Sequence, residues 1–466
     1  MTRPLSVALC LATLSACGGG KSGGGAPADR AALVARIDSI VSAPIDQGKV
    51  AGASIAVVRG SDTIAVQGFG RANLELDVPT PPHAIYEIGS VTKQFTASAI
   101  LQLVEQGKVD LDADVRTYLP DYNSQGRRIP VRRLMDHTSG IKGYTEMPEF
   151  GTLASQKLPR DTLVTLFSKQ PFDFEPGEEL IYNNSAYFLL GLIIEKVSGQ
   201  PYAEYVKEHL FGPAGMVDAQ YCSERSVQAR KVQGYDTDRV EGDNPDSTRL
   251  VLKGYIDHTW PYSAGSLCAS AIDLVAWNQA LHGGRILGAE AYHELVTPGT
   301  LNDGTPVRYA KGIVPEPVLG HRAFEHGGGI PGFLSENLYF PDDSLSIVVL
   351  YNTAGPVGPE AAARAIAEAI LGTPPDDSVP FEGDAATYAG TFTGRGRGRP
   401  TEITVVADGG RLRVKRAEAD TGRVLRYLGG DTFGLGTAHY TFVRNGATVT
   451  GLTLDAIGTL NHLVRK

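Results

Sequence analysis

Hydrophobic and polar positions follow different patterns in different parts of the chain, and each pattern predicts its own elements. Residues 53–58 and 63–67 are rich in β-forming side chains and are separated by four mostly polar residues, which predicts a β-hairpin. Residues 92–106 carry apolar side chains on nearly every side of a helix. This pattern is typical of a helix that is buried all round.

The middle of the chain, residues 110–280, has a mostly helical pattern broken by Gly and Pro, including helices expected at 185–197 and 202–210. Strand character returns at 337–340 and 345–350, and an Ala-rich helix follows. Since sheet segments flank a helical region, we expect both ends to meet in one mixed sheet covered by helices.

Residues 372–380 are rich in Pro and Asp and have no periodicity, which predicts a linker. Beyond them, short alternating runs such as 401–406 and 439–443 are separated by Gly-containing turns. This predicts a small all-β unit, a barrel or a sandwich, with a core separate from that of the preceding region.

The N-terminus combines a basic residue, a short apolar stretch and small residues ending at Cys17. An apolar stretch this short does not span a bilayer and indicates an export signal. The segment Leu14-Ser15-Ala16-Cys17 resembles the lipobox of bacterial lipoproteins, in which the cysteine is lipidated. The Gly-rich residues 18–25 that follow predict a flexible tether. We therefore expect an exported envelope protein, anchored to a membrane through lipid on Cys17, at its periplasmic or outer-membrane face.

The net charge of −9 offers no broad basic surface, which argues against a nucleic-acid partner. The run Arg395-Gly-Arg397-Gly-Arg399 is a local exception, and its glycines favour a solvated loop over a polyanion site. The ten histidines are scattered and no spaced Cys/His cluster accompanies them, so we expect no metal and no other cofactor. The oligomeric state is left open.

Cys10 leaves with the signal and Cys17 carries lipid, so Cys222 and Cys268 are the two cysteines of the folded part. An even pair in an oxidising compartment favours a disulfide. Two buried free thiols are the alternative.

Ser90-Val-Thr-Lys93 places a hydroxyl and an amine three residues apart at the start of the predicted buried helix. Residues at this spacing share one helix face, so the lysine can reach the serine. Burial lowers the pKa of an amine, which allows a lysine to act as a base and activate a serine nucleophile.

Two further segments carry candidate chemistry, each with a plain structural alternative. Tyr182-Asn-Asn184 offers a second proton-transfer group and an amide that can donate to a substrate carbonyl, but Asn before a helix is also an ordinary cap. His326-Gly-Gly-Gly329 lies just before strands, where glycines let a backbone N–H approach a ligand. Its alternative is a tight turn with a surface histidine.

The order Ser-x-x-Lys, Tyr-x-Asn and His-Gly-Gly resembles the serine β-lactamase and penicillin-binding-protein family, in its class C, esterase and D-aminopeptidase branch. Further phrases support the resemblance over residues 35–371; they are Glu87-Ile-Gly-Ser90, His137-Thr-Ser-Gly140, Phe211-Gly-Pro-Ala-Gly-Met216 and Ala264-Gly-Ser-Leu-Cys268. It implies an α+β fold, with a mixed antiparallel sheet, flanking helices and a helical lobe.

The resemblance also implies a role for each matched residue. Ser90 is the expected nucleophile, Lys93 and Tyr182 the general-base pair, and Asn184 the residue that orients Lys93 and the substrate. His326 holds the position usually occupied by lysine. The implied oxyanion and substrate-binding residues are Gly328 and Gly329, with the backbone N–H groups of Ser90 and Gly329 forming the oxyanion hole.

Similar proteins carry a C-terminal lipocalin-like β domain, which suits the all-β unit. The expected division of the chain is a lipoprotein signal peptide (1–17), a flexible tether (18–30), a serine hydrolase domain (31–372), a linker (373–382) and an all-β domain (383–466).

One departure from the family pattern bears on the substrate. The third element commonly reads Lys-Thr-Gly, in which the Thr hydroxyl holds a substrate carboxylate, whereas Gly327 has no hydroxyl. This favours hydrolysis of esters, amides or D-amino-acid peptides through an acyl-enzyme. Two alternatives stay open: a slowly deacylating penicillin-binding protein, D-Ala-D-Ala carboxypeptidase or β-lactamase, and a non-catalytic binding lipoprotein of the envelope.

Overall fold

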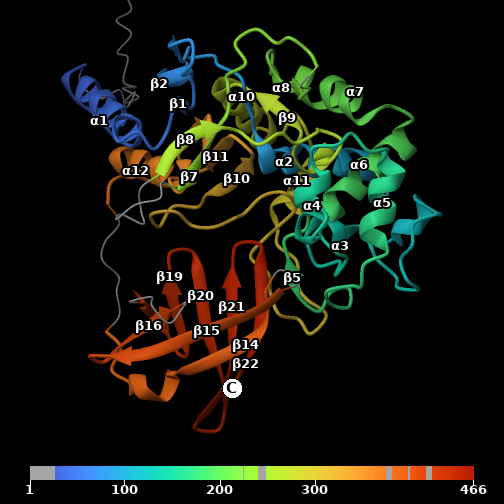
Figure 1. Cartoon of the computed structure of the whole chain (residues 1–466), viewed down its shortest axis with the longest axis vertical. Helices are drawn as coiled ribbons and strands as arrows, with labels where there is room; N and C mark the ends of the chain where they lie inside the picture. Colours follow the sequence, from blue (N-terminus) through green and yellow to red (C-terminus); the bar gives the residue numbers. More distant parts are fainter. Residues whose placement is uncertain (1–26, 224, 240–247, 374–379, 397–398, 416–421) are drawn as a thin grey trace, which may run out of the picture.

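The computed structural model describes residues 27–223, 225–239, 248–373, 380–396, 399–415 and 422–466 (Figure 1). The predicted signal peptide, Cys17 and Arg397 lie outside the described residues. Helix α1 (Pro27–Asp46) already includes residues 27–30 of the predicted tether, since Asp29 and the alanines after it favour a helix start. Within the described part of the chain, no helix combines the length and apolar character needed to cross a bilayer.

The N-terminal domain is built on a six-stranded antiparallel sheet with the order β10-β11-β12-β1-β2-β3. Its strands are β1 (Gly52–Arg59), β2 (Asp62–Asn73), β3 (Val78–Pro79), β10 (Phe324–Ile330), β11 (Phe333–Phe340) and β12 (Leu345–Tyr351). β1 pairs with β2 as the predicted hairpin and with β12 on its other side. The prediction that both ends of the domain meet in one sheet is confirmed.

Helices cover both faces of this sheet, which is why β12 is mostly apolar and is buried along its whole length. α1 and α12 (Pro359–Leu371) pack on one face, where Val41 and Ile366 join the sheet residues in one core. α10 (Ala271–His282) packs on the other face. The predicted buried helix is α2 (Thr92–Glu105), which belongs to this second core.

The predicted helical lobe lies beside the sheet (Figure 1). Its helices, with α11 at its edge, are α3 (Val131–Met135), α4 (Phe150–Leu153), α5 (Arg160–Ser168), α6 (Asn184–Ser198), α7 (Tyr202–Val206), α8 (Gly212–Ala214), α9 (Tyr262–Gly265) and α11 (Ala289–Val296). The predicted helix 185–197 is α6, and the one at 202–210 is α7 continued by a π turn, Lys207–Phe211.

Two small sheets that the sequence did not predict pack with the lobe and the main sheet. One is β4 (Tyr86–Glu87), β9 (Leu267–Ala269) and β6 (Gln220–Tyr221). The other is β13 (Thr353–Ala354), β7 (Tyr235–Arg239) and β8 (Thr248–Leu252).

A disulfide joins Cys222 to Cys268, so the predicted pairing is confirmed and the alternative of two free thiols is wrong. Both residues are buried, and they stand at the junction of β6 and β9. The bond closes a loop with a sequence separation of 46, which in the chain-entropy model stabilises the fold by about 4 kcal/mol. It therefore holds β9 (Leu267–Ala269), which packs against the first turn of α2.

The C-terminal domain is all β, as predicted, and has its own core around Phe392 and Leu452. Its strands are β14 (Gly390–Gly396), β15 (Arg399–Asp408), β16 (Arg411–Lys415), β17 (Arg423–Val424), β18 (Arg426–Gly429), β19 (Thr432–Leu435), β20 (Ala438–Asn445), β21 (Thr448–Ala456) and β22 (Thr459–Arg465). The end strands of the sheet, β17 and β18, follow one another in the chain, so the sheet curls into a nearly closed barrel.

The two domains also share an apolar cluster, although the linker predicted that their cores are separate. β5 (Leu180–Ile181) of the N-terminal domain pairs with β22 and extends the barrel sheet to ten strands. Leu180 and Leu460 pack with Val307 and Tyr309 in one apolar cluster. Because β5 immediately precedes Tyr182, the barrel is attached beside the candidate site.

Candidate active site

Ser90 lies in a short 3-10 turn, Gly89–Val91, that joins β4 to α2. Gly89 has a φ of 49°, and a Cβ there would lie 2.7 Å from the backbone nitrogen of Gly329. Only glycine fits this position without strain, so the turn that carries Ser90 rests directly on β10.

Lys93 is fully buried one turn further along and makes three polar contacts. Its Nζ lies 2.8 Å from Asn184 Oδ1, 2.8 Å from the Ala264 carbonyl oxygen and 3.1 Å from Ser90 Oγ. The carbonyl and the amide oxygen only accept, so they take two amine hydrogens. The contact between Lys93 Nζ and Ser90 Oγ can run in either direction. When the Lys93 amine is neutral, its lone pair can accept the hydrogen of the Ser90 hydroxyl.

Tyr182 and Asn184 stand on either side of the residue that caps α6. Asn183 is the N-cap, and its side chain accepts from the backbone N–H of Ala186. The capping role therefore belongs to Asn183, which leaves the Asn184 side chain to contact Lys93 and, through Nδ2, Thr145 Oγ1 at 3.3 Å. The Tyr182 ring lies 4.6 Å from Lys93 Nζ.

His137 holds this segment in place, a role the sequence did not reveal. Its Nδ1 accepts the backbone N–H of Asn183 at 3.1 Å, and its ring centroid lies 4.3 Å from that of Tyr182. His137 has a φ of 63°, unusual for a residue with a side chain. The conformation turns the ring onto Tyr182.

His326 is buried, so the alternative of a surface histidine is wrong. Its Nδ1 lies 2.6 Å from the Gly327 carbonyl oxygen, which only accepts, so Nδ1 carries the hydrogen. The Tyr309 hydroxyl, 2.9 Å from Nε2, then donates to it. Burial and the nearby Lys93 lower the pKa of His326 to about 3, so the imidazole is neutral at physiological pH. Tyr309 is a second site residue that the sequence did not reveal.

Gly328, the middle one of the three glycines after His326, makes room for close packing. A Cβ on Gly328 would lie 2.1 Å from the Ile88 carbonyl oxygen and 2.3 Å from Ser335 Oγ, so only glycine fits. Ser335 in turn donates to Ile88 at 2.9 Å and ties β11 to the turn that carries the nucleophile.

These residues open on one cavity of about 370 Å³. It is lined by Ser90, Tyr182, Tyr309, Val314, His326, Gly327, Gly328, Gly329, Leu334, Ser335, Glu336, Gly358, Pro359, Glu360 and Ile457. All the predicted catalytic and substrate-binding residues except Lys93 and Asn184 line this cavity. Lys93 and Asn184 contact one another behind Ser90. Ile457 comes from the C-terminal domain, which therefore contributes to the wall. Among the described residues, no group of three or more His, Cys, Asp or Glu side chains is arranged to hold a metal ion.

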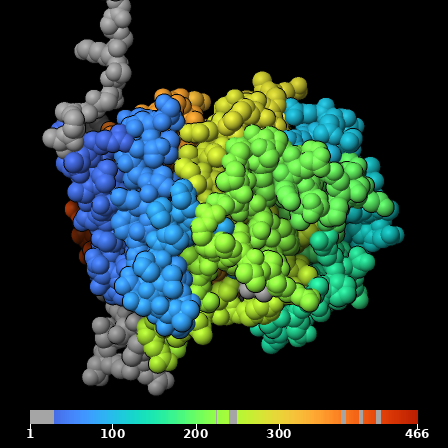
Figure 2. Space-filling model, turned by 90° about the horizontal axis from the view of Figure 1, so that it is seen from above, coloured from blue at the N-terminus to red at the C-terminus, as the bar shows by residue number. Residues whose placement is uncertain are grey.

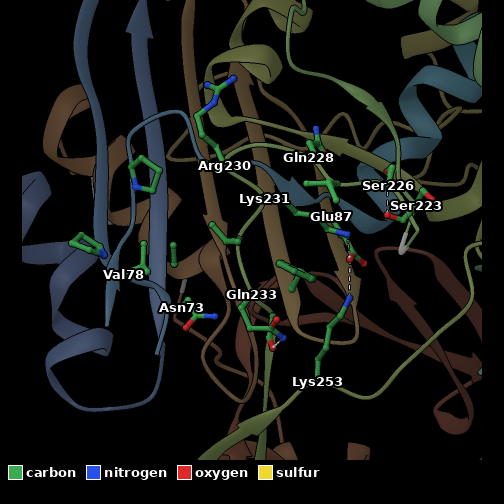
Figure 3. Close-up of a pocket in the computed structure, with 17 residues that line it drawn as sticks. Asn73, Val78, Glu87, Ser223, Ser226, Gln228, Arg230, Lys231, Gln233 and Lys253 are labelled. Atoms are coloured by element: carbon green, nitrogen blue, oxygen red, sulfur yellow. Dashed lines mark hydrogen bonds and ion pairs between the residues drawn. The ribbon is translucent and has the colours of Figure 1, made fainter. Parts of the chain in front are cut away.

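A larger cavity, of about 740 Å³, shares no lining residue with the cavity at Ser90 (Figure 3). It runs between residues 72–81 and the segment after Cys222, which adjoin one another in Figure 2. Lys253 and Lys231 approach the buried Glu87 there, at 2.7 and 3.4 Å. Burial alone would raise the pKa of Glu87, but His258 and the two lysines hold it below its ordinary value. Glu87 thus anchors the strand before Ser90.

The barrel supports Tyr182 directly through its last hairpin. The backbone N–H of Tyr182 donates to the Gly458 carbonyl at 2.8 Å, and a Cβ on Gly458 would lie 3.2 Å from Tyr182 Cβ. Replacing Gly458, whose φ is 77°, with alanine is expected to lower kcat about ten- to a hundredfold by shifting Tyr182. Steady-state kinetics would measure this loss.

Gly446→Ala is the matched control. Gly446 also has a positive φ, 60°, in a hairpin turn of the same barrel, but nothing lies within 4 Å of its Cβ position. It should cost similar stability, about 1 kcal/mol, with kcat unchanged. Equal kcat in both variants would show that the barrel does not position Tyr182.

Comparison with known proteins agrees with this geometry. Residues 37–371 match the β-lactamase family, and the chain belongs to that family. A D-aminopeptidase of Gluconobacter oxydans is 27% identical over 391 residues, covering 81% of this chain and 70% of that protein. The protein is thus a serine hydrolase of the β-lactamase family.

Two solved structures share the fold. The octameric penicillin-binding protein homologue from Pyrococcus abyssi has a TM-score of 0.63 and 25% identity, and the match covers 93% of this chain and all of that one. A D-stereospecific amidohydrolase from Streptomyces sp. has a TM-score of 0.61 and 27% identity, covering 73% of this chain and 99% of that one. The first match extends over the C-terminal barrel as well as the N-terminal domain.

Proposed function

We propose that the chain hydrolyses amides, peptides or esters whose acyl part is a D-amino acid, through an acyl-enzyme on Ser90. The observation that carries this proposal is the contact of Lys93 with Ser90, in a cavity whose histidine is neutral and whose position 327 has no hydroxyl. The stereochemistry follows the D-specific relatives.

The proposed reaction uses the chain's own groups. Ser90 Oγ attacks the substrate carbonyl carbon while its proton passes to Lys93 Nζ, and Tyr182 relays that proton to the leaving amine or alcohol. The backbone N–H groups of Ser90 and Gly329 stabilise the oxyanion. Water then attacks the acyl carbon and gives up a proton, which passes through Lys93 to Ser90 Oγ as the bond between Ser90 and the acyl group breaks, and the acid leaves.

A panel of substrates tests the proposal. Penicillin carries a carboxylate, and the cavity offers it a neutral imidazole and no hydroxyl at position 327. Losing a charge-assisted hydrogen bond costs about 1.5 to 3 kcal/mol, or roughly ten- to a hundredfold in kcat/KM. We therefore expect D-alanine p-nitroanilide and p-nitrophenyl acetate to be cleaved with higher kcat/KM than benzylpenicillin, and the L-alanine anilide at least about tenfold more slowly than the D isomer.

The competing activities give different results on the same panel. Faster cleavage of benzylpenicillin than of every neutral ester would favour a β-lactamase, and a burst of one equivalent without turnover a slowly deacylating penicillin-binding protein. A folded protein that cleaves nothing and does not react with a fluorophosphonate would be the non-catalytic binding lipoprotein.

We also propose that the protein is exported and held at the bacterial envelope by lipid on Cys17, facing the periplasm or the outer membrane. The lipobox resemblance and the Gly-rich residues after it support this proposal. Cys17→Ser is expected to move the protein from the membrane fraction to the soluble fraction, as judged by fractionation and blotting. The unchanged Cys222–Cys268 pair is the internal control, and continued membrane association would refute the anchor.

A further inference from the structure

Glu336 stands out among the residues of the active-site cavity. It is 5% exposed, and its Oε1 is fully buried without a hydrogen-bond partner among the described residues. An unpartnered buried carboxyl oxygen is costly, so a ligand that donates a hydrogen bond to Glu336 would stabilise it. Neither the sequence motifs nor the proposed reaction uses it.

The sheet register places Glu336 at the position where the family's third motif acts. Glu336 is the cross-strand partner of Gly327, and side chains of paired residues stand on the same face. A Cβ on Gly327 would lie 3.1 Å from Glu336 Oε2. The Glu336 carboxyl therefore occupies the part of the cavity wall that a side chain at position 327 would fill.

The surrounding charges leave Glu336 without a cation of its own. Arg364 is held by Glu325, at 2.8 and 2.9 Å, and by Glu360, at 2.9 Å. Among the described residues that line the cavity, none is a lysine or an arginine. Burial and the nearby Glu325 and Glu360 raise the pKa of Glu336 well above its ordinary value. Without a bound cation this favours the neutral carboxyl, since three carboxyls share one guanidinium. A positive charge bound beside Glu336 would favour its ionised form.

We propose that Glu336, with Glu360 beside it, binds a primary ammonium group of the substrate within the active-site cavity. Both residues line the cavity together with Ser90, and the remaining wall includes the apolar Val314, Leu334 and Ile457. Such a pocket suits a molecule with an apolar body and an ammonium group, and it repels a carboxylate. This specificity rests on the proposed function, because it names the charge of the substrate that Ser90 attacks.

Inhibition by small ions tests the subsite without a D-amino-acid substrate. The full-length protein hydrolyses p-nitrophenyl acetate in the presence of n-butylammonium, n-butanol or butyrate, which differ in charge at nearly constant size. We expect the ammonium to inhibit competitively at a concentration about ten- to a hundredfold lower than the other two. Glu336→Gln should remove this difference, and Glu336→Ala serves the same purpose if the Gln variant does not fold.

Glu325→Gln is the matched control. It removes a carboxyl from the same cluster, but Glu325 faces Arg364 and does not line the cavity. The ammonium preference should survive in this variant. An equal loss in both variants would mean a general effect of negative charge, and an unchanged preference in the Glu336 variants would overturn the subsite.

Two substrate pairs then locate the ammonium group. D-alanine p-nitroanilide and its N-acetyl derivative differ in an ammonium on the acyl side. N-acetyl-D-alanine aminoethylamide and N-acetyl-D-alanine glycinamide differ in an ammonium on the leaving group. Glu336→Gln should reduce the kcat/KM ratio about ten- to a hundredfold in one pair, and no change in either pair would contradict substrate recognition by Glu336.

The proposed function and the subsite can fail separately. If wild type cleaves p-nitrophenyl acetate but no D-alanyl compound, the proposed function fails while the inhibition series still decides the subsite.

Discussion

Replacing Ser90 with alanine is expected to lower kcat by at least about four orders of magnitude and to abolish labelling by a fluorophosphonate. The hydroxyl is the group that Lys93 contacts at 3.1 Å, and without it no acyl-enzyme forms. The free energy of unfolding should change by no more than about 1 kcal/mol, because only one hydrogen bond is lost. Active-site labelling, steady-state kinetics and thermal denaturation measure the three quantities.

Ser98→Ala is the control for this experiment. Ser98 lies on α2, the helix that follows the turn of Ser90, is fully buried and donates to the Gln94 carbonyl at 2.8 Å. Its loss should cost comparable stability and leave labelling intact. Turnover within tenfold of wild type in Ser90→Ala would remove Ser90 as the nucleophile.

Lys93→Ala and Tyr182→Phe are each expected to lower kcat by about three orders of magnitude or more, and the double variant should lose little beyond the worse single one. Lys93 Nζ lies 4.6 Å from the Tyr182 ring centroid, and in the proposed reaction the two side chains pass one proton as a unit. Losses that multiply in the double variant would contradict a shared proton path.

Lys311→Ala separates this effect from the loss of any buried lysine. Lys311 is 4% exposed, donates to the Thr297 carbonyl at 2.8 Å and pairs with Glu294 at 3.1 Å. We expect it to lower the melting temperature while keeping kcat within about threefold of wild type. A large loss of kcat here would mean that distortion of the core explains the Lys93 result.

Local spacing predicted the parts of the site that depend on local geometry. Residues three apart on a helix share a face, so the contact between Ser90 and Lys93 follows from the sequence alone. The contact of Asn184 with Lys93 joins positions 91 residues apart, and only the resemblance to a family pointed to it. The capping alternative holds for Asn183, while the adjacent Asn184 contacts Lys93, so two neighbouring asparagines divide the two roles.

The residues that the sequence did not reveal depend on register and on the meeting of distant segments. Glu336 lies in a strand and matches no motif; only its pairing with Gly327 brings it to the cavity. Tyr309 lies in no helix or strand and contacts His326 across the cavity. In the same way, the apolar cluster of Leu180, Tyr309 and Leu460 draws on segments that carry no common pattern.

The pairing of β22 with β5 has a consequence for the order of events during biogenesis. Asn461 and Glu179 contact one another across 282 residues of chain, so this seam closes only after the barrel strands have been made and folded. The N-terminal domain emerges first, with the backbone of Tyr182 still lacking its bond to Gly458. We expect the newly made enzyme to remain a poor catalyst until the barrel docks against the N-terminal domain. Hydrolysis should therefore begin only after β22 has been made and has paired with β5.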